Sequence, residues 1–561
     1  MTRKPLAVLL VLSSLTLAAA QPPRFYPDDP LAREPESQDA SGAREADVGL
    51  FYDLAFGIFG TTRRDPANLH ALNVNTIDEV PDSGWFTNRI LPRQIPNDDL
   101  VRGPNVGTPP NPDRWVLIRE KSAGYSPGFT AKDANGETWF VSFDAPGSEE
   151  GATAAIVVAS KIFWALGYNQ VETFITTVDP RKVTIDPAAT TRRPNGKRTP
   201  TRRGDLESIF ERAARSTDGT YRAAAGRIVP GRVLGPFRYE GTRSDDPNDI
   251  VPHEHRRELR ALRVFGAWTN LTDLKAGNTL DTVIPVNGRS VVRHYLQDVG
   301  STFGVGANGP HDWDEGFEYF YEGSRSRKRL MTLGLALSPW QTADYPDFPS
   351  VGRFESEQFD PVTWKPHAPT AGYIELLPDD AFWAARRVAA FDDALIRALV
   401  HTGRFSDPAA EEYLATTLMR RRDKIARAYL PAVNPIVNPR LDNDGMLTFE
   451  NAATAAADAP APPGYRAEWR QFDNVTGQTR RLGEARGNRQ ALLAPAPLPL
   501  ADGAFVQIDV VCDGAANPEW QRPVRLYFRR GAGRWTLAGL TRGVGREPPA
   551  VTTRPAERRG R

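Results

Sequence analysis

Three polar residues in the middle of the chain, Asp273, Asn278 and Asp298, have the types and spacing of a phosphoryl-transfer site. An acid is followed by an amide five residues later, and a second acid comes after a predicted β-hairpin. In phosphoryl transfer a carboxylate accepts the proton of the attacking hydroxyl, while carboxylate and amide oxygens hold the divalent cation. The pattern therefore predicts three catalytic residues, with Asp273 as the base and Asn278 and Asp298 as metal ligands.

The hairpin between these acids is predicted by Asn287-Gly288, which separates two β-branched runs. A type I′ turn needs a positive φ at both central residues, and this dipeptide tolerates it. The two strands would fold back on each other and bring Asp298 toward Asp273. A purely structural interpretation also exists, in which Asp273 caps a turn, Asn278 begins a strand and Asp298 ends one.

With Asp273-Leu-Lys-Ala-Gly-Asn278 and Asp298-Val-Gly300, the segment resembles the catalytic loop and the DFG region of protein kinases. Leu271-Thr272 stands where kinases usually have the histidine and arginine before the catalytic acid. This departure makes the segment more similar to atypical kinases, such as the HipA-like, spore-coat CotH-like and phosphatidylinositol-kinase-like groups. The resemblance implies an α+β fold with two lobes: a small antiparallel β lobe with a helix, and a larger, mainly helical lobe.

The elements of the small lobe are predicted directly after residue 113. Three strands and one helix have the expected order, and Ser148 suits the helix N-cap; their ranges are 115–118, 129–132, 137–143 and 148–166. The resemblance places the loop between the first two strands over the nucleotide phosphates. The nucleotide-binding residues implied in this way are Ser122, Gly124 and Gly128, together with Lys132 on the second strand.

The ion pair typical of the kinase small lobe is missing. Ser142 occupies the place of the strand lysine, and the middle of the helix reads Ala154-Ala-Ile-Val-Val158 where a glutamate is expected. We predict that Ser142 faces the cleft with Ile156 opposite it. Either Lys132 or Lys161 reaches the cleft instead, or the protein has lost catalysis and is a pseudokinase.

Composition excludes several classes of partner. The chain has 561 residues and a net charge of +1, so nothing argues for nucleic acid or an anionic membrane as a bulk partner.

Arg3 and Lys4, an apolar run and Ala18-Ala19-Ala20 predict a signal peptide cleaved near Ala20. We expect export to the periplasm or medium and no transmembrane segment. The single Cys512 excludes a disulfide scaffold.

Composition shifts and the resemblance together divide the chain. The predicted parts are a signal peptide (1–20), an irregular N-terminal wrap (21–112), an N-lobe (113–180), a C-lobe (181–450), a linker (451–463), a small all-β domain (464–545) and a disordered tail (546–561). Between 180 and 203 we expect a solvated connector. Three helices are predicted at 379–390, 392–402 and 408–429.

The function implied is ATP- and Mg²⁺-dependent transfer of a phosphoryl group to a hydroxyl of a protein or small molecule. A second possibility is a non-catalytic envelope scaffold on the same fold. A third is a cell-envelope hydrolase or carbohydrate-binding protein. The sequence has no H-E-x-x-H motif of the familiar metal-dependent hydrolases.

Overall fold

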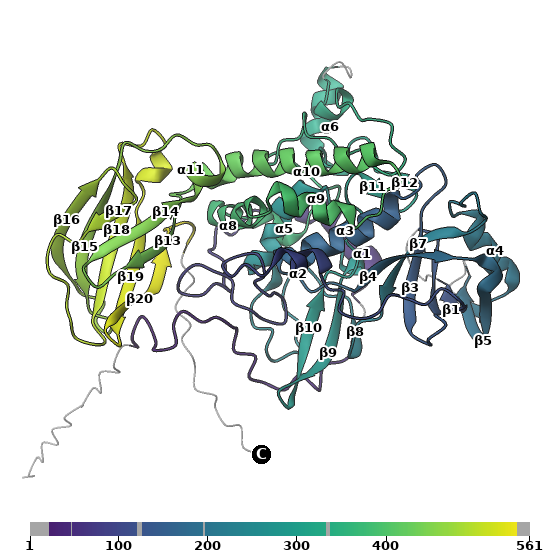
Figure 1. Cartoon of the computed structure of the whole chain (residues 1–561), viewed down its shortest axis with the longest axis horizontal. Helices are drawn as coiled ribbons and strands as arrows, with labels where there is room; N and C mark the ends of the chain where they lie inside the picture. Colours follow the sequence, from purple (N-terminus) through teal and green to yellow (C-terminus); the bar gives the residue numbers. More distant parts are fainter. Residues whose placement is uncertain (1–21, 47, 121–125, 194–196, 333–336, 547–561) are drawn as a thin grey trace, which may run out of the picture.

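The computed structural model describes residues 22–46, 48–120, 126–193, 197–332 and 337–546. It is a mixed α and β fold, with a seven-stranded sheet at one end, helices in the middle and a five-stranded sheet at the other end (Figure 1). The predicted signal peptide lies outside the described residues, as does the predicted tail apart from residue 546. Within the described residues, no helix is both long and apolar enough to cross a membrane.

The seven-stranded sheet has the strand order β4-β7-β3-β2-β1-β5-β6. Its strands are β1 (Trp115–Glu120), β2 (Gly128–Lys132), β3 (Thr138–Phe143), β4 (Thr173–Val178), β5 (Val183–Arg192), β6 (Arg198–Pro200) and β7 (Tyr221–Arg227). The three predicted strands are confirmed as β1, β2 and β3. The solvated connector predicted between 180 and 203 is wrong, because β5 pairs in parallel with β1 and buries Val183 and Ala189.

The two faces of this sheet have different neighbours. One face packs on α4 (Arg203–Glu211), through a cluster that includes Phe129, Phe143 and Phe210. Next to the other face lies α3 (Gly151–Leu166), where the sequence predicted a helix. Its predicted cap is wrong: Ser148 lies before the helix, and the Asp144 carboxylate accepts hydrogen bonds from the backbone N–H and hydroxyl of Thr153. A carboxylate in this place satisfies a free first-turn N–H group as a capping side chain would.

The helical part is built on α5 (Arg257–Thr269), α8 (Pro378–Ala389), α9 (Asp393–His401) and α10 (Pro408–Tyr429). The three helices predicted after residue 378 are confirmed as α8, α9 and α10. Their apolar residues recur every three or four positions, which gives α9 and α10 one buried face, whereas α8 is buried on nearly all sides. The other helices are α1 (Leu50–Phe59), α2 (Asn97–Arg102), α6 (Gly323–Met331), α7 (Ala371–Ile374) and α11 (Ala452–Ala456).

The predicted hairpin follows α5. It consists of β9 (Leu280–Val286) and β10 (Arg289–Tyr295), with β8 (Arg232–Gly235) paired to β9. The turn has φ values of 49° at Asn287 and 78° at Gly288, as a type I′ turn requires. The hairpin prediction is therefore confirmed, and it returns the chain toward the residues that follow α5.

The C-terminal sheet has the order β16-β15-β18-β19-β20. Its strands are β15 (Gly464–Phe472), β16 (Thr479–Gly487), β18 (Phe505–Asp513), β19 (Val524–Gly531) and β20 (Arg534–Thr541). A smaller sheet joins β13 (Ile436–Leu441), β14 (Met446–Asn451) and β17 (Ala491–Leu493). One apolar core continues from Trp268 of α5 to Trp469 of β15, so this sheet and the helices are packed together.

Candidate functional site

The segment after α5 brings the three predicted catalytic residues together. Asn270 ends the helix in the left-handed conformation, with φ at 56°, and turns the chain toward Asp273. The Asn278 side-chain amide donates a hydrogen bond to the Asp273 carbonyl over 2.7 Å. The Asp298 backbone N–H donates to the Asn278 carbonyl over 3.0 Å. Asn278 thus connects a loop acid to an acid that follows the hairpin.

The side chains at this junction suit a hard cation. The Asn278 amide nitrogen donates its hydrogen bond to the Asp273 carbonyl, so the amide oxygen is not needed for this contact. The exposed Asp298 carboxylate is oriented by the Gly300 N–H, which donates to its Oδ1 over 3.1 Å. Amide and carboxylate oxygens are the donors that Mg²⁺ prefers. The Asp273 carboxylate pairs with the Lys275 amine at 2.8 Å.

Asp298 also lines a cavity of about 120 Å³ between the seven-stranded sheet and α3. The sheet contributes residues of β2, β3, β4 and β7, and the chain after β10 closes the cavity with Gln297, Asp298 and Val299. Among the described residues that line it, Asp298 alone carries a charge. The cavity is therefore mostly apolar with one carboxylate at its edge.

Ser142 and Ile156 both line this cavity, as predicted. A Cβ atom on Gly300 would lie 2.7 Å from Ile156 Cγ1 and 3.3 Å from Asp298 Oδ1, so the helix residue packs directly on the segment that holds Asp298. In place of a lysine–glutamate pair the cavity has a hydroxyl and an apolar side chain. The helix is held here by packing and not by charge.

The other predicted nucleotide-binding residues divide into two groups. Ser122 and Gly124 lie outside the described residues, and Gly128 opens β2 opposite Ser142. Lys132 is exposed at the far end of β2, opposite Thr138, and does not line the cavity.

Lys161 does not line it either, since its side chain packs against Gly103 of the segment after α2. Burial, and then the charge of Arg404, lowers the pKa of Lys161 to about 8. Neither candidate lysine therefore takes the place of the missing cation among the described residues of the cavity.

Three further polar residues beside this site were missed in the sequence. The Ser301 hydroxyl lies 2.9 Å from His311 Nε2, and His311 Nδ1 lies 3.4 Å from Glu315 Oε2. Burial lowers the pKa of the His311 imidazole more than the Glu315 carboxylate raises it. The segment that holds these residues has few runs of periodic apolar spacing. Its polar residue types were therefore the sole signal of a functional role in the sequence.

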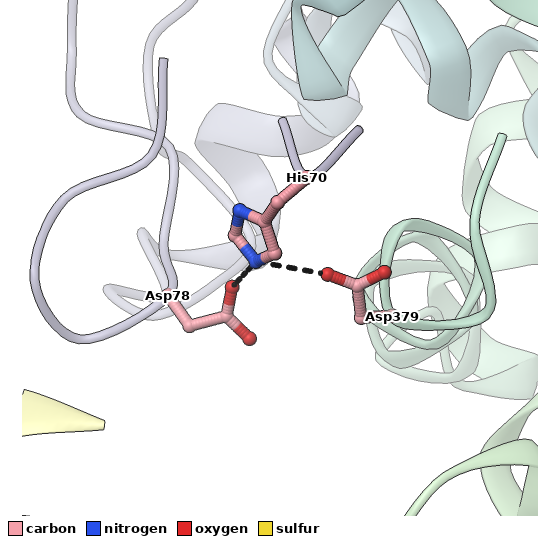
Figure 2. A group of neighbouring side chains, drawn as sticks. All are labelled: His70, Asp78 and Asp379. Atoms are coloured by element: carbon pink, nitrogen blue, oxygen red, sulfur yellow. Dashed lines mark ion pairs between the residues drawn. The ribbon is translucent and has the colours of Figure 1, made fainter. Parts of the chain in front are cut away.

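A second cluster with metal-ligand chemistry is structural. His70 Nε2 lies 3.1 Å from Asp379 Oδ2 and 3.5 Å from Asp78 Oδ1 (Figure 2). The fully buried Arg257 guanidinium contacts the same two carboxylate oxygens at 2.7 Å each. A cation bound there would face a guanidinium and compete for oxygens already in use. The cluster is an ion network that joins the N-terminal wrap, α5 and α8.

Comparison with known proteins gives matches to solved structures alone. No protein-family profile matches the chain, and no curated protein does. The proinflammatory kinase CtkA of Helicobacter pylori is 14% identical, with 56% of this chain and 94% of that chain covered at a TM-score of 0.30. The Golgi casein kinase with Mn and ADP bound is 10% identical, with 59% and 74% covered at 0.29. A second structure of the Golgi casein kinase is 10% identical, with 60% and 74% covered at 0.30.

Proposed function

We propose that the protein binds a nucleoside triphosphate with Mg²⁺ beside Asp298 and transfers its γ-phosphoryl group slowly to a hydroxyl. One observation carries this proposal. Asp298 lines an apolar cavity and is also joined through Asn278 to a second acid, Asp273. A planar base needs an apolar space, and a triphosphate needs a cation held by oxygen ligands next to it.

Each residue has a role that its contacts allow. The Asn278 amide oxygen and the Asp298 carboxylate would hold Mg²⁺, which neutralises phosphate charge when bound. Asp273 would accept the proton of the attacking hydroxyl, and Lys275, paired with it at 2.8 Å, would supply positive charge nearby. The predicted phosphate loop from Ser122 to Gly128 belongs to this proposal, and Lys132 has no part in it.

The transfer is proposed to be slow because the cavity has no cation among its described residues. Phosphoryl transfer depends mainly on positioning and on stabilisation of negative charge. Without a lysine beside the phosphates, binding survives better than turnover does. The residues therefore fit a nucleotide-binding protein with weak phosphotransfer better than a rapid kinase.

A melting experiment tests the binding. A ligand that binds the folded state alone stabilises it by about 2.7 kcal/mol at a hundredfold excess over Kd. ATP with Mg²⁺ should therefore raise Tm of the full chain by about 2 °C, and Asp298→Ala should remove the metal-dependent part. Asp273→Ala should keep most of the shift and lose phosphotransfer to an added acceptor, because a base contributes to chemistry more than to affinity.

The matched control is Asp502→Ala, which removes an exposed carboxylate shortly before β18 of the five-stranded sheet; that sheet lies at the end of the molecule away from the seven-stranded sheet (Figure 1). It should behave as wild type. A melting curve that does not respond to any nucleotide or divalent metal, in wild type and variants, would rule out the proposed function.

The export predicted from residues 1–20 remains part of the proposal. It places the acceptor hydroxyl on a protein or small molecule outside the cytoplasm. N-terminal sequencing of protein recovered from the periplasm or medium tests this directly, since cleavage near Ala20 should leave Gln21 as the first residue.

A further inference from the structure

Ser301 and His311 are brought together by a short loop after Asp298. The chain passes through β11 (Val305–Gly306) and β12 (Gly309–Pro310), which pair with each other. His311 then returns, and its backbone N–H donates to the Gly304 carbonyl over 2.8 Å. This closure places Nε2 of the buried imidazole 2.9 Å from the half-buried Ser301 hydroxyl.

The imidazole has two neighbours at Nδ1, and they favour different tautomers. Glu315 Oε2 lies 3.4 Å away and accepts a hydrogen bond from Thr272 over 2.6 Å. The Asn270 amide nitrogen also lies 3.4 Å away. A carboxylate repels a bare nitrogen lone pair and attracts an N–H group, so its charge favours a proton on Nδ1. Nε2 then accepts the hydrogen of the Ser301 hydroxyl.

A serine, an imidazole and a carboxylate in this order form a nucleophile, its base and the group that orients the base. The nucleophile comes three residues after Asp298. The base lies close enough to Asp273 for that carboxylate to act on its pKa. Ser301 is thus near the proposed metal ligand along the chain, and His311 lies within electrostatic range of the proposed catalytic acid.

We propose that Ser301 is the protein's own phosphoryl acceptor, with His311 as its base and Glu315 as the positioning residue. This inference rests on the proposed function, because a nucleoside triphosphate is the donor. The Ser301 oxygen forms a bond to the γ-phosphorus. The bond from that phosphorus to the bridging oxygen breaks, and its electron pair leaves with the nucleoside diphosphate. The hydroxyl proton passes to His311 Nε2, which has for this internal acceptor the role that Asp273 would have for a free one.

An internal acceptor suits a site that lacks a cation beside the phosphates. A group held in place reacts at an effective concentration that no free hydroxyl reaches, on the order of 10⁵ M or more in well-oriented cases. Such an advantage offsets part of the loss from the missing lysine. A single slow phosphorylation of Ser301 is therefore the expected product, and not rapid modification of added substrates.

The test uses the full chain purified without prior exposure to nucleotide. After incubation with ATP and Mg²⁺, intact mass should increase by one phosphoryl group, and peptide sequencing should place it on Ser301. Ser301→Ala should remove the modification and keep the nucleotide-dependent melting shift. Ser208→Ala, an exposed hydroxyl on α4, is the matched control and should leave both unchanged.

Two further variants test the roles of the base and the positioning residue. His311→Gln keeps a polar side chain but cannot accept the proton, so the rate should fall by about 100-fold or more. Glu315→Gln removes the charge that raises the pKa of His311, while Asp273 still raises it and His367 still lowers it. The pH at which the rate reaches half its maximum should move to lower values. A purely structural role of Glu315 would leave this midpoint unchanged.

Two results separate this inference from the proposed function. If ATP with Mg²⁺ raises Tm but Ser301 stays unmodified, the inference is overturned and nucleotide binding stands. If Tm does not respond and no phosphoserine forms, both are overturned. Phosphorylation at another residue with Ser301 unmodified also overturns the inference.

Discussion

At the scale of single residues, main-chain contacts assemble the candidate site and leave the side chains available for chemistry. Asp298 is held by its backbone N–H, and Asp273 by its carbonyl, both through Asn278. Neither carboxylate takes part in these two hydrogen bonds, so the bonds position both acids without occupying their side chains. Backbone hydrogen bonds also survive side-chain substitution, so variants at Asp273 and Asp298 should keep the loop in place.

The missing cation can be restored at one position. Ser142→Lys places an amine in the cavity next to Asp298, where it would meet the phosphates of a bound nucleotide. Charge-assisted hydrogen bonds are worth about 1.5–3 kcal/mol, and the new cation also pairs with Asp298 in the free protein. We expect ATP affinity to rise by about tenfold and the rate of phosphotransfer to rise as well.

Ser142→Met is the control, because it adds length without charge. Isothermal titration with ATP and Mg²⁺ should show tighter binding for the lysine variant and equal or weaker binding for methionine. If both variants bind alike, the cavity does not receive the phosphates near Ser142. A double variant, Ser142→Lys with Ile156→Glu, tests whether an acid on the helix orients the new amine. ATP affinity measured in the same way shows the effect.

At the scale of elements, local signals in the sequence were sufficient for four helices, α3, α8, α9 and α10, and for the central hairpin. Asn287-Gly288 determines the turn between β9 and β10. The helical spacing of apolar residues in α8, α9 and α10 can be recognised from each segment alone, without knowing what it packs against. β5 was missed because its burial depends on pairing with β1. In this pairing Val183 lies beside Trp115, which is nearly seventy residues earlier in the chain. Long-range pairing leaves a weaker trace in a single strand.

The same distinction explains the candidate site. Asp273, Asn278 and Asp298 were found because their spacing along the chain carries the pattern. The contact between Ser301 and His311 depends on how the intervening loop closes, and that closure comes from contacts with other segments. Gly304 is one such point, since its carbonyl accepts from the N–H groups of both His311 and Arg353.

Gly304→Ala should open this loop. Gly304 has a φ of +69°, and a Cβ there would lie 2.2 Å from the carbonyl carbon of Arg353. The left-handed conformation costs a non-glycine residue about 1–2 kcal/mol, and the contact with rigid backbone adds to it. We expect a loss of roughly 2 kcal/mol or more in the free energy of unfolding, with phosphorylation of Ser301 lost in the remaining folded protein.

The comparison variant is Gly42→Ala. Gly42 is exposed, and a Cβ there meets nothing within 4 Å, so its free energy of unfolding should change by less than about 1 kcal/mol. Urea unfolding curves measure both variants. Equal stability of the two alanine variants would show that the backbone around Gly304 yields more easily than its contacts indicate.

At the scale of the whole molecule, charged residues attach the N-terminal segment to the helices. Arg256, Arg257, Arg260 and Arg387 are at most 1% exposed. Their partners include Glu34, Asp78 and Glu79 from the segment before β1 and Asp379 and Asp380 from α8. From the sequence, such arginines are expected on the surface, because burial of a guanidinium depends on acids that are distant along the chain. The sequence alone could not predict this network.

His70 makes the network sensitive to pH. Burial lowers the pKa of its imidazole, but the hydrogen bonds to Asp379 and Asp78 outweigh burial and raise the pKa to about 10 (Figure 2). A raised pKa in the folded state means that the charged form stabilises the fold. This contribution is complete below the ordinary histidine pKa of 6.5, decreases as pH rises and is lost above about 10. It amounts to at most about 5 kcal/mol.

We therefore expect His70→Gln to lower the free energy of unfolding by a few kcal/mol near neutral pH and to have little effect above pH 10. Urea unfolding of both proteins across this range measures the difference, in which the ionisation of lysines and tyrosines cancels. His401→Gln is the control, since its side chain is 80% exposed and should change stability little at any pH. A deficit of His70→Gln that stays constant from neutral to alkaline pH would mean that the imidazole acts by packing. In that case its charge would not join the N-terminal segment to α8.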